Sequence, residues 1–96
     1  MRDKLQTIFE HFFYEQLIIF IRTTEKKTQK KLTQENIAER LEMSLRSYSD
    51  IYLRKSCCSA LTLALFLLYC CDNASDFLNN LREQFEEQIE LHYSSK

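Results

Sequence analysis

The chain has neither glycine nor proline among its 96 residues, and this double absence constrains the fold more than any other feature. Phosphate-binding loops, dinucleotide-binding turns, collagen repeats and the primed turns of β-hairpins all need glycine. Proline is the other residue that most strongly interrupts a helix. A chain without either residue is therefore predicted to be all-α, with helix ends set by polar caps and short polar turns.

The size of the chain predicts a single compact domain over residues 1–96. Hydrophobic residues make up 45 % of it, which is a globular composition. The longest apolar run, residues 60–71, is shorter than the roughly 20 residues that cross a bilayer, so we expect a buried core helix there and no membrane partner. The N-terminus lacks the pattern of a signal peptide, so we expect a cytoplasmic protein.

Apolar residues recur at spacings of three and four in five segments, which predicts a five-helix domain. The first helix is expected over residues 3–29 and the fourth over residues 59–70. Thr33 and Ser44 are predicted to cap two short helices separated by a turn at 42–43, and Asn73 to cap a fifth helix of about 20 residues. The expected inward-facing residues are Leu5, Ile8, Phe9, Phe12, Phe13, Gln16 and Ile19 or Phe20, then Ile37, Ala38 and Leu41, then Tyr48 and Ile51, with Tyr52 against the fourth helix, and finally Leu78, Leu81, Phe85, Ile89 and Tyr93.

Charge is unevenly distributed along the chain, although the net charge is only −1. Residues 22–55 carry nine Lys or Arg against five Asp or Glu, whereas residues 56–96 carry two against six. A basic middle segment fits an anionic partner. The alternative is a dipolar surface that only meets solvent.

The four cysteines form two adjacent pairs, at 57–58 and 70–71. Neighbouring residues on a helix point about 100° apart, and neither pair has the gap of a zinc-binding motif. The two histidines, His11 and His92, are far from both pairs in the sequence. We therefore expect small buried hydrophobic residues in a reducing compartment, with metal binding or redox sensing as the alternatives, and predict no metal and no cofactor.

Residues 32–63 resemble a known DNA-binding motif. The segment LTQENIAERLEMSLRSYSDI has a Leu-Thr-Gln opening, an aliphatic–alanine pair, an aliphatic residue, a small turn and a serine-led helix. The residues that carry this order are Leu32, Thr33, Gln34, Ile37, Ala38, Leu41, Met43 and Ser44. In this order and spacing the segment resembles the helix-turn-helix of the Cro/phage-repressor-like (XRE) family of bacterial regulators, and the resemblance covers about residues 12–81.

The resemblance implies a lambda-repressor-like DNA-binding fold with its helix-turn-helix at about residues 33–55. It also implies a transcriptional regulator, most simply a repressor, that binds double-stranded DNA as a homodimer without a cofactor or small-molecule substrate. The long fifth helix, at about residues 74–93, exceeds what a small domain needs to cover, so we expect its end to pair two chains together with the first helix.

The geometry of the family places the second helix of the motif in the major groove, with its first residues at the base edges. Arg46 is expected to read a guanine, because its guanidinium matches both acceptors of that base. Leu45 is expected against a thymine methyl group, and Asp50 against a cytosine amine. The complete set of implied DNA-binding residues is Thr33, Gln34, Ser44, Leu45, Arg46, Ser47, Ser49, Asp50, Arg54 and Lys55.

The sequence departs from the family at both ends of the second helix of the motif. Glu42 occupies the turn position that is usually glycine, and Tyr52, Leu53 and Arg54 replace a glutamate, any residue and a glycine. Without that glutamate, an ion pair to the first helix is lost. Without the glycine, Arg54 must adopt the left-handed conformation or the helix must end differently.

A second interpretation is a protein-interaction module on a helix-turn-helix scaffold that no longer reads DNA. Asp50, the near-neutral charge and the apolar residues Leu45, Tyr52 and Leu53 favour it.

Catalysis is not predicted, because no nucleophile has a base placed beside it in the sequence pattern.

Overall fold

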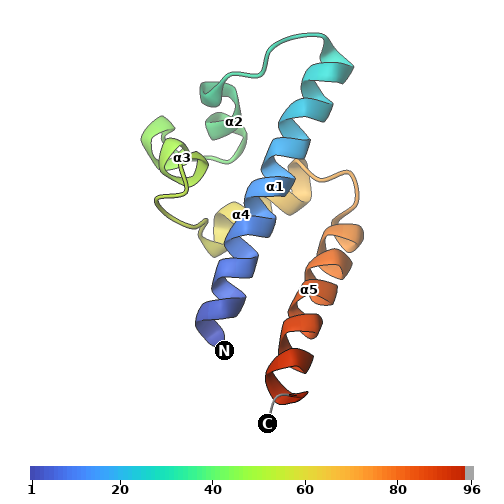
Figure 1. Cartoon of the computed structure of the whole chain (residues 1–96). Coiled ribbons are helices and arrows are strands. Elements are labelled where there is room, and N and C mark those ends of the chain that lie inside the picture. The colour runs from blue at the N-terminus through green and yellow to red at the C-terminus, as the bar shows by residue number, and fades with distance from the viewer. Residues whose placement is uncertain (95–96) are drawn as a thin grey trace.

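The computed structural model describes residues 1–94, and this part of the chain folds into five α-helices without any strand (Figure 1). The all-α prediction and the number of helices are therefore confirmed for these residues. The helices are α1 (Arg2–Thr28), α2 (Gln34–Arg40), α3 (Leu45–Tyr52), α4 (Ala60–Tyr69) and α5 (Ala74–Ser94).

Helix α1 lies at the centre of the molecule, between the other helices. Helix α5 runs beside it in the opposite direction, α4 crosses behind it, and the short helices α2 and α3 form a separate pair on the other side (Figure 1). The molecule measures 50 × 26 × 19 Å and has a radius of gyration of 14.8 Å. A compact domain of this length would have about 12.5 Å. The molecule is therefore more elongated than a compact domain of this length, because α1 and α5 extend together beyond the core.

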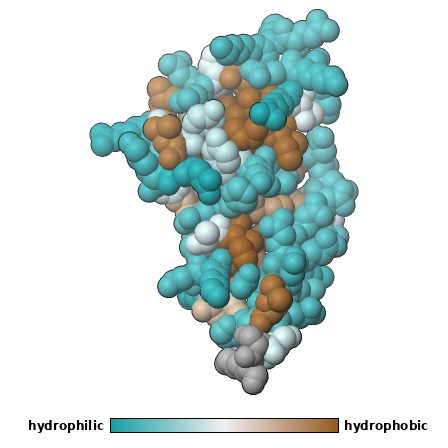
Figure 2. Space-filling view, in the orientation of Figure 1, coloured by the Kyte–Doolittle hydropathy of each residue, from teal (hydrophilic) through white to brown (hydrophobic). Residues whose placement is uncertain are grey.

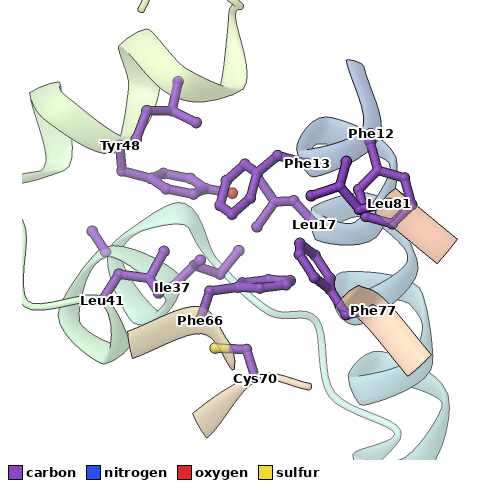
Figure 3. Close-up of a cluster of buried hydrophobic side chains, with 12 residues drawn as sticks. Phe12, Phe13, Leu17, Ile37, Leu41, Tyr48, Phe66, Cys70, Phe77 and Leu81 are labelled. Carbon is purple, nitrogen blue, oxygen red and sulfur yellow. The ribbon is translucent and has the colours of Figure 1, made fainter. Parts of the chain in front are cut away.

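The core is built around aromatic rings that come from three helices (Figure 3). The ring of Phe66 on α4 lies 5.0 Å from Phe13 of α1 and 6.0 Å from Phe77 of α5. Phe77 in turn meets Phe12 edge-to-face at 4.9 Å. Such tilted and edge-to-face arrangements are favoured by the charge distribution of aromatic rings. This cluster fixes α4 and α5 on α1.

The short helices contribute the inward-facing residues that their spacing predicts. Ile37, Ala38 and Leu41 are buried in α2 and at its end, and Tyr48 and Ile51 are buried in α3. Fully burying one aliphatic side chain of this size stabilises a fold by roughly 1.5–3 kcal/mol. Helices as short as α2 and α3 are not stable on their own, so the packing of their buried side chains against the core keeps them helical.

The predicted buried face is wrong in part of α5. On α1, Phe20 packs against the core and Ile19 is 54 % exposed, so the second of these two alternatives holds. On α5, Leu78 and Tyr93 are 48 % and 65 % exposed. Phe77, one residue before Leu78, is buried instead. The line of contact between α1 and α5 is narrow and the core covers only part of their length. The spacing of apolar residues therefore indicates both helices correctly but misplaces part of the buried face of α5.

Helix α4 is also not the fully buried helix that its apolar sequence predicts. Phe66 and Thr62 are buried, but Leu61, Leu68 and Tyr69 expose 66 %, 69 % and 69 % of their surface. Only one side of α4 meets α1 and α5, so its other side faces outward. Among the described residues, no helix combines the length and the apolar character needed to cross a membrane.

Polar side chains begin four of the helices, as expected for a chain without proline or glycine. The side chains of Thr33, Ser44 and Ser59 each accept a hydrogen bond from the backbone N–H three residues on, at 3.1–3.2 Å. Asn73 does the same before α5, accepting from the N–H of Asp76 at 3.2 Å. Each cap satisfies one N–H that the helix itself leaves without a partner.

Three helices end on a left-handed residue that is not glycine. These residues are Gln29, Glu42 and Arg54, with φ values of 56°, 54° and 62°. Of the two alternatives for the end of α3, the structure therefore has Arg54 in the left-handed conformation. Each such residue costs about 1–2 kcal/mol relative to glycine, because its Cβ crowds the following carbonyl oxygen.

Candidate nucleic-acid interface

Helices α2 and α3 pack against each other across a turn of four residues, 41–44. The turn has the hydrogen bonds of a Schellman motif, in which Met43 N–H donates to the Ala38 carbonyl at 3.0 Å and Glu42 N–H donates to the Glu39 carbonyl at 3.1 Å. Glu42 holds the left-handed position in this turn. The turn thus forms without the glycine that is usual there, and α3 begins directly after it.

The start of α3 is held by serines. Ser44 Oγ accepts from the backbone N–H of Ser47 at 3.1 Å and donates to the hydroxyl of Ser47 at 2.9 Å. One lone-pair site and the hydroxyl proton of Ser47 remain available to an outside partner. Thr33 forms a similar reciprocal cap with Asn36 at the start of α2.

The two sides of α3 have different environments. Tyr48 and Ile51 point into the core (Figure 3 shows Tyr48), at 0 % and 7 % exposure. Leu45, Arg46 and Ser47, in the first turn of the helix, are exposed. The orientation of α3 is therefore fixed by its buried side, and its first turn faces outward.

The ten implied site residues divide into four groups. Thr33 and Gln34 are exposed at the start of α2, and residues 44–47 are exposed at the start of α3. Ser49 and Asp50 are only half-exposed, so they offer less surface to a partner than expected. Arg54 and Lys55 lie beyond the other end of α3, about 12 Å from its start, since a helix rises about 1.5 Å per residue.

Aromatic residues tie α3 to α1, a contact that the spacing of residues in the sequence does not predict. The ring of Tyr52 lies 6.0 Å from that of Tyr14 on α1, and the guanidinium of Arg54 lies 5.4 Å from the centre of the Tyr14 ring. The ring neighbours of Tyr52 are Tyr14 and Tyr48, and its side chain packs half-buried against the core. Arg54 is therefore directed towards α1 by a cation–π contact.

Carboxylates surround the start of α3. Glu35, Glu39 and Glu42 line a shallow hollow together with Met43, Ser44 and Leu45. All three glutamates are exposed. The motif itself, residues 33–55, contains four Lys or Arg and four Asp or Glu, so it is formally neutral. The positive excess of residues 22–55 therefore lies before the motif, in residues 22–32.

The excess positive charge lies at the far end of α1 and in the loop after it. Lys26, Lys27, Lys30 and Lys31 are all exposed there. Lys30 and Lys31 line a second hollow that also contains Asn36 and Arg40 of α2. Lys27 lies 3.9 Å from Asp72, a loose ion pair across exposed surface. The basic surface thus borders α2 rather than α3.

One polar group in the core of this unit has no partner. The hydroxyl of Tyr48 is fully buried and makes no hydrogen bond within residues 1–94. Burial, reinforced by the neighbouring Tyr52 and Tyr14, raises the pKa of Tyr48 to about 12. The side chain therefore remains neutral at physiological pH, and its hydroxyl has lost its hydration without compensation.

The four cysteines are free thiols, with Cys70 buried and the other three half-buried. Burial raises the pKa of Cys58 to about 12 and that of Cys70 to about 11, and it also raises the pKa of Cys71. These thiols are therefore protonated and weakly reactive at neutral pH. Among the described residues, no three His, Cys, Asp or Glu side chains come together as a metal site.

Comparison with protein-family models, with curated proteins and with solved structures finds no match to this chain. The features that bear on function are therefore the geometry of α2 and α3 and the resemblance of residues 32–63 to the XRE motif.

Proposed function

We propose that the protein is a sequence-specific DNA-binding regulator, of the lambda-repressor-like type, that occupies an operator as a homodimer and acts as a repressor in the cytoplasm. The observation that carries this proposal is the orientation of α3. Its buried side holds it on the core through Tyr48 and Ile51, while Leu45, Arg46 and Ser47 extend outward from its first turn. This is the part of a recognition helix that meets base edges.

Arg46 has the leading role in the proposed readout. It is exposed, and it takes no part in the ion pairs and cation–π contacts found within residues 1–94. Its guanidinium is thus available for the two acceptors of a guanine. Gln34, Ser47 and Lys55 would bind the phosphate backbone, which sets register rather than sequence preference.

Selection of binding sites from a randomised DNA duplex pool tests the proposal. We expect a palindromic consensus whose half-sites lie about one helical turn apart, with binding that weakens steeply as salt rises. Absence of enrichment over several rounds would rule out an operator-reading function.

The variant Arg46→Ala tests the role of the leading residue on the selected site. We expect a loss of about 1–3 kcal/mol in binding free energy and relaxed preference at one base position. Lys55→Ala should instead lower the salt slope by about one and leave the preference unchanged. Arg82→Ala, an exposed arginine on α5, is the matched control and should change neither quantity. Equal losses on selected and scrambled DNA for Arg46→Ala would remove this residue from readout.

The carboxylates beside α3 favour a second function, the binding of a basic segment of another protein. Glu35, Glu39 and Glu42 give the hollow a negative charge, and Met43 and Leu45 add apolar side chains to its lining. Such a surface suits a peptide with lysine or arginine beside an apolar residue.

The combined variant E35Q/E39Q/E42Q separates the two functions. If the surface meets DNA, removal of three negative charges should strengthen DNA binding several-fold, because repulsion of the phosphates falls. If the surface binds a basic peptide, the variant should lose peptide binding, and its affinity for DNA should not rise. Titration of a lysine-rich and an arginine-rich model peptide against both proteins distinguishes these results.

A further inference from the structure

The outward side of α4 has a composition that is unusual for exposed surface. Leu61, Ala64 and Leu68 follow one another along one side of the helix at spacings of three and four, and all three are exposed. Tyr69 is 69 % exposed next to them. We call these four residues the α4 face. A helix that is apolar on all sides is normally covered on all sides, but α1 and α5 cover only one.

The α4 face also lacks the charges that normally keep exposed helices apart. Residues 56–71 contain no Asp, Glu, Lys or Arg. The other large apolar residues exposed in residues 1–94 do not form a comparable row on one helix: Met1, Ile19, Leu45, Leu53, Leu78, Leu91 and Tyr93. A partner surface must therefore be apolar and uncharged, and within this part of the chain the best match for the α4 face is the α4 face itself.

We propose that two copies of this chain associate through their α4 faces, related by a two-fold axis that passes beside Ala64. The small side chain of Ala64 lets the two helices approach closely. Leu61 of one copy then packs on Leu68 of the other, and the same contact is repeated by symmetry. This inference concerns the surface of association and does not depend on the proposed DNA binding.

Charge favours this surface over the other candidate, the far end of α5. Residues 82–90 contain four glutamates and one arginine, so a two-fold contact there would bring the like charges of two chains together. The expected pairing through the ends of α5 and α1 must overcome this repulsion. The α4 face has no such charge to overcome.

The size of the α4 face predicts a weak dimer. Three large side chains exposed by about two-thirds offer an apolar patch on the order of 300–400 Å², within the range of functional patches on single chains. A standard stable interface buries about 800 Å² per partner. The dimer should therefore dissociate on dilution.

Sedimentation equilibrium of the full chain, from about 10 µM to 1 mM and without DNA, tests the proposal. We expect the wild type to shift from monomer to dimer over this range. Leu68→Glu should raise the dissociation constant at least about tenfold, because the interface would then bury a charge without a partner. Leu91→Glu, a similarly exposed leucine on α5, is the matched control and should leave it unchanged. Circular dichroism of each variant verifies that the helices remain folded.

The double variant L61K/L68E examines the two-fold arrangement itself. It places a lysine of each copy against a glutamate of the other, so two copies of the double variant should associate more tightly than two copies of L68E. A wild type that stays monomeric throughout, or an equal or greater loss in Leu91→Glu, would overturn the proposal. A double variant as weak as L68E would overturn the antiparallel pairing of Leu61 with Leu68.

Discussion

At the scale of single residues, the hydroxyl of Tyr48 is the clearest local source of instability. It is buried in the core without a hydrogen-bond partner in the described chain. Leaving a buried donor unpaired costs about 1–3 kcal/mol. We therefore expect Tyr48→Phe to raise the free energy of unfolding by about 1 kcal/mol, measured by urea denaturation.

The matched control is Tyr52→Phe, because Tyr52 lies next to Tyr48 and is only half-buried. Removal of the Tyr52 hydroxyl should change the free energy of unfolding by less than about 0.5 kcal/mol. A Tyr48→Phe protein that is less stable than the wild type would show that the hydroxyl is hydrogen-bonded in solution.

The buried thiols and Tyr48 together make stability depend on alkaline pH. The pKa values of Cys58, Cys70 and Tyr48 are raised to about 12, 11 and 12 in the folded chain, against ordinary values of 9.0, 9.0 and 10.0. Unfolding therefore exposes groups that lose protons more readily. Their contribution to stability is fully present below pH 9 and falls as the pH rises towards 11 to 12.

We expect the midpoint of urea unfolding to fall steadily above pH 9, and to fall less in Cys70→Ala. Measurements at several pH values between 8 and 11 test this, each compared with the same protein at pH 8. An unchanged slope in Cys70→Ala would mean that this thiol titrates alike in the folded and unfolded chains.

At the scale of elements, the helix ends show how a chain without glycine turns corners. The turn before α3 keeps the hydrogen bonds of a Schellman motif with Glu42 in the left-handed position. Glu42→Gly should relieve the crowding of its Cβ and stabilise the fold by about 0.5–1 kcal/mol, after allowance for the greater freedom of glycine in the unfolded chain.

The matched control for this turn is Glu39→Gly, three residues earlier and inside α2. There the same replacement should destabilise the fold by about 1 kcal/mol, because glycine is unfavourable within a helix. Thermal unfolding of both variants gives the comparison. Destabilisation by Glu42→Gly would mean that the carboxylate makes a stabilising contact in solution.

The elements could be predicted from the sequence because their determinants are local. Thr33, Ser44 and Asn73 cap helices as expected, since a cap depends only on the residues next to it. The buried faces of α4 and α5 could not be predicted in the same way. Whether Leu68 or Leu78 faces the core or the solvent depends on neighbours that are distant in the sequence.

The candidate site shows the same limit. The exposed first turn of α3 follows from the spacing of Tyr48 and Ile51, so Arg46 is correctly expected at the surface. The cluster of Tyr14, Tyr52 and Arg54 joins residues about 40 apart and has no signal in the spacing of residues. The neutral charge of residues 33–55, in contrast, can be counted directly from the sequence.

At the scale of the whole molecule, stability is concentrated in one half. The buried residues of α1 are Phe12, Phe13 and Leu17, and those of α5 are Phe77 and Leu81. The first ten residues and residues 82–94 therefore contain no fully buried side chain. Their helical hydrogen bonds should open locally without unfolding of the core.

Amide hydrogen exchange should show this difference directly. We expect exchange in residues 3–8 and 86–93 to be at least about tenfold faster than in residues 12–20 at low protein concentration. Equal protection along all of α1 would contradict this prediction. Protection that grows at these ends with protein concentration would instead favour association through α5 and α1.

The antiparallel arrangement of α1 and α5 has a practical consequence. The beginning of α1 and the end of α5 lie at the same end of the molecule, away from α3 (Figure 1). On the side shown in Figure 2, the apolar surface is broken by hydrophilic areas. A fluorescent protein or surface-immobilisation tag attached at the start of α1 would lie beside the end of α5, and both positions are at a distance from α3. Donor and acceptor dyes attached at the start of α1 and at the end of α5 would lie near each other in the folded chain, so a loss of energy transfer would report separation of these two helix ends.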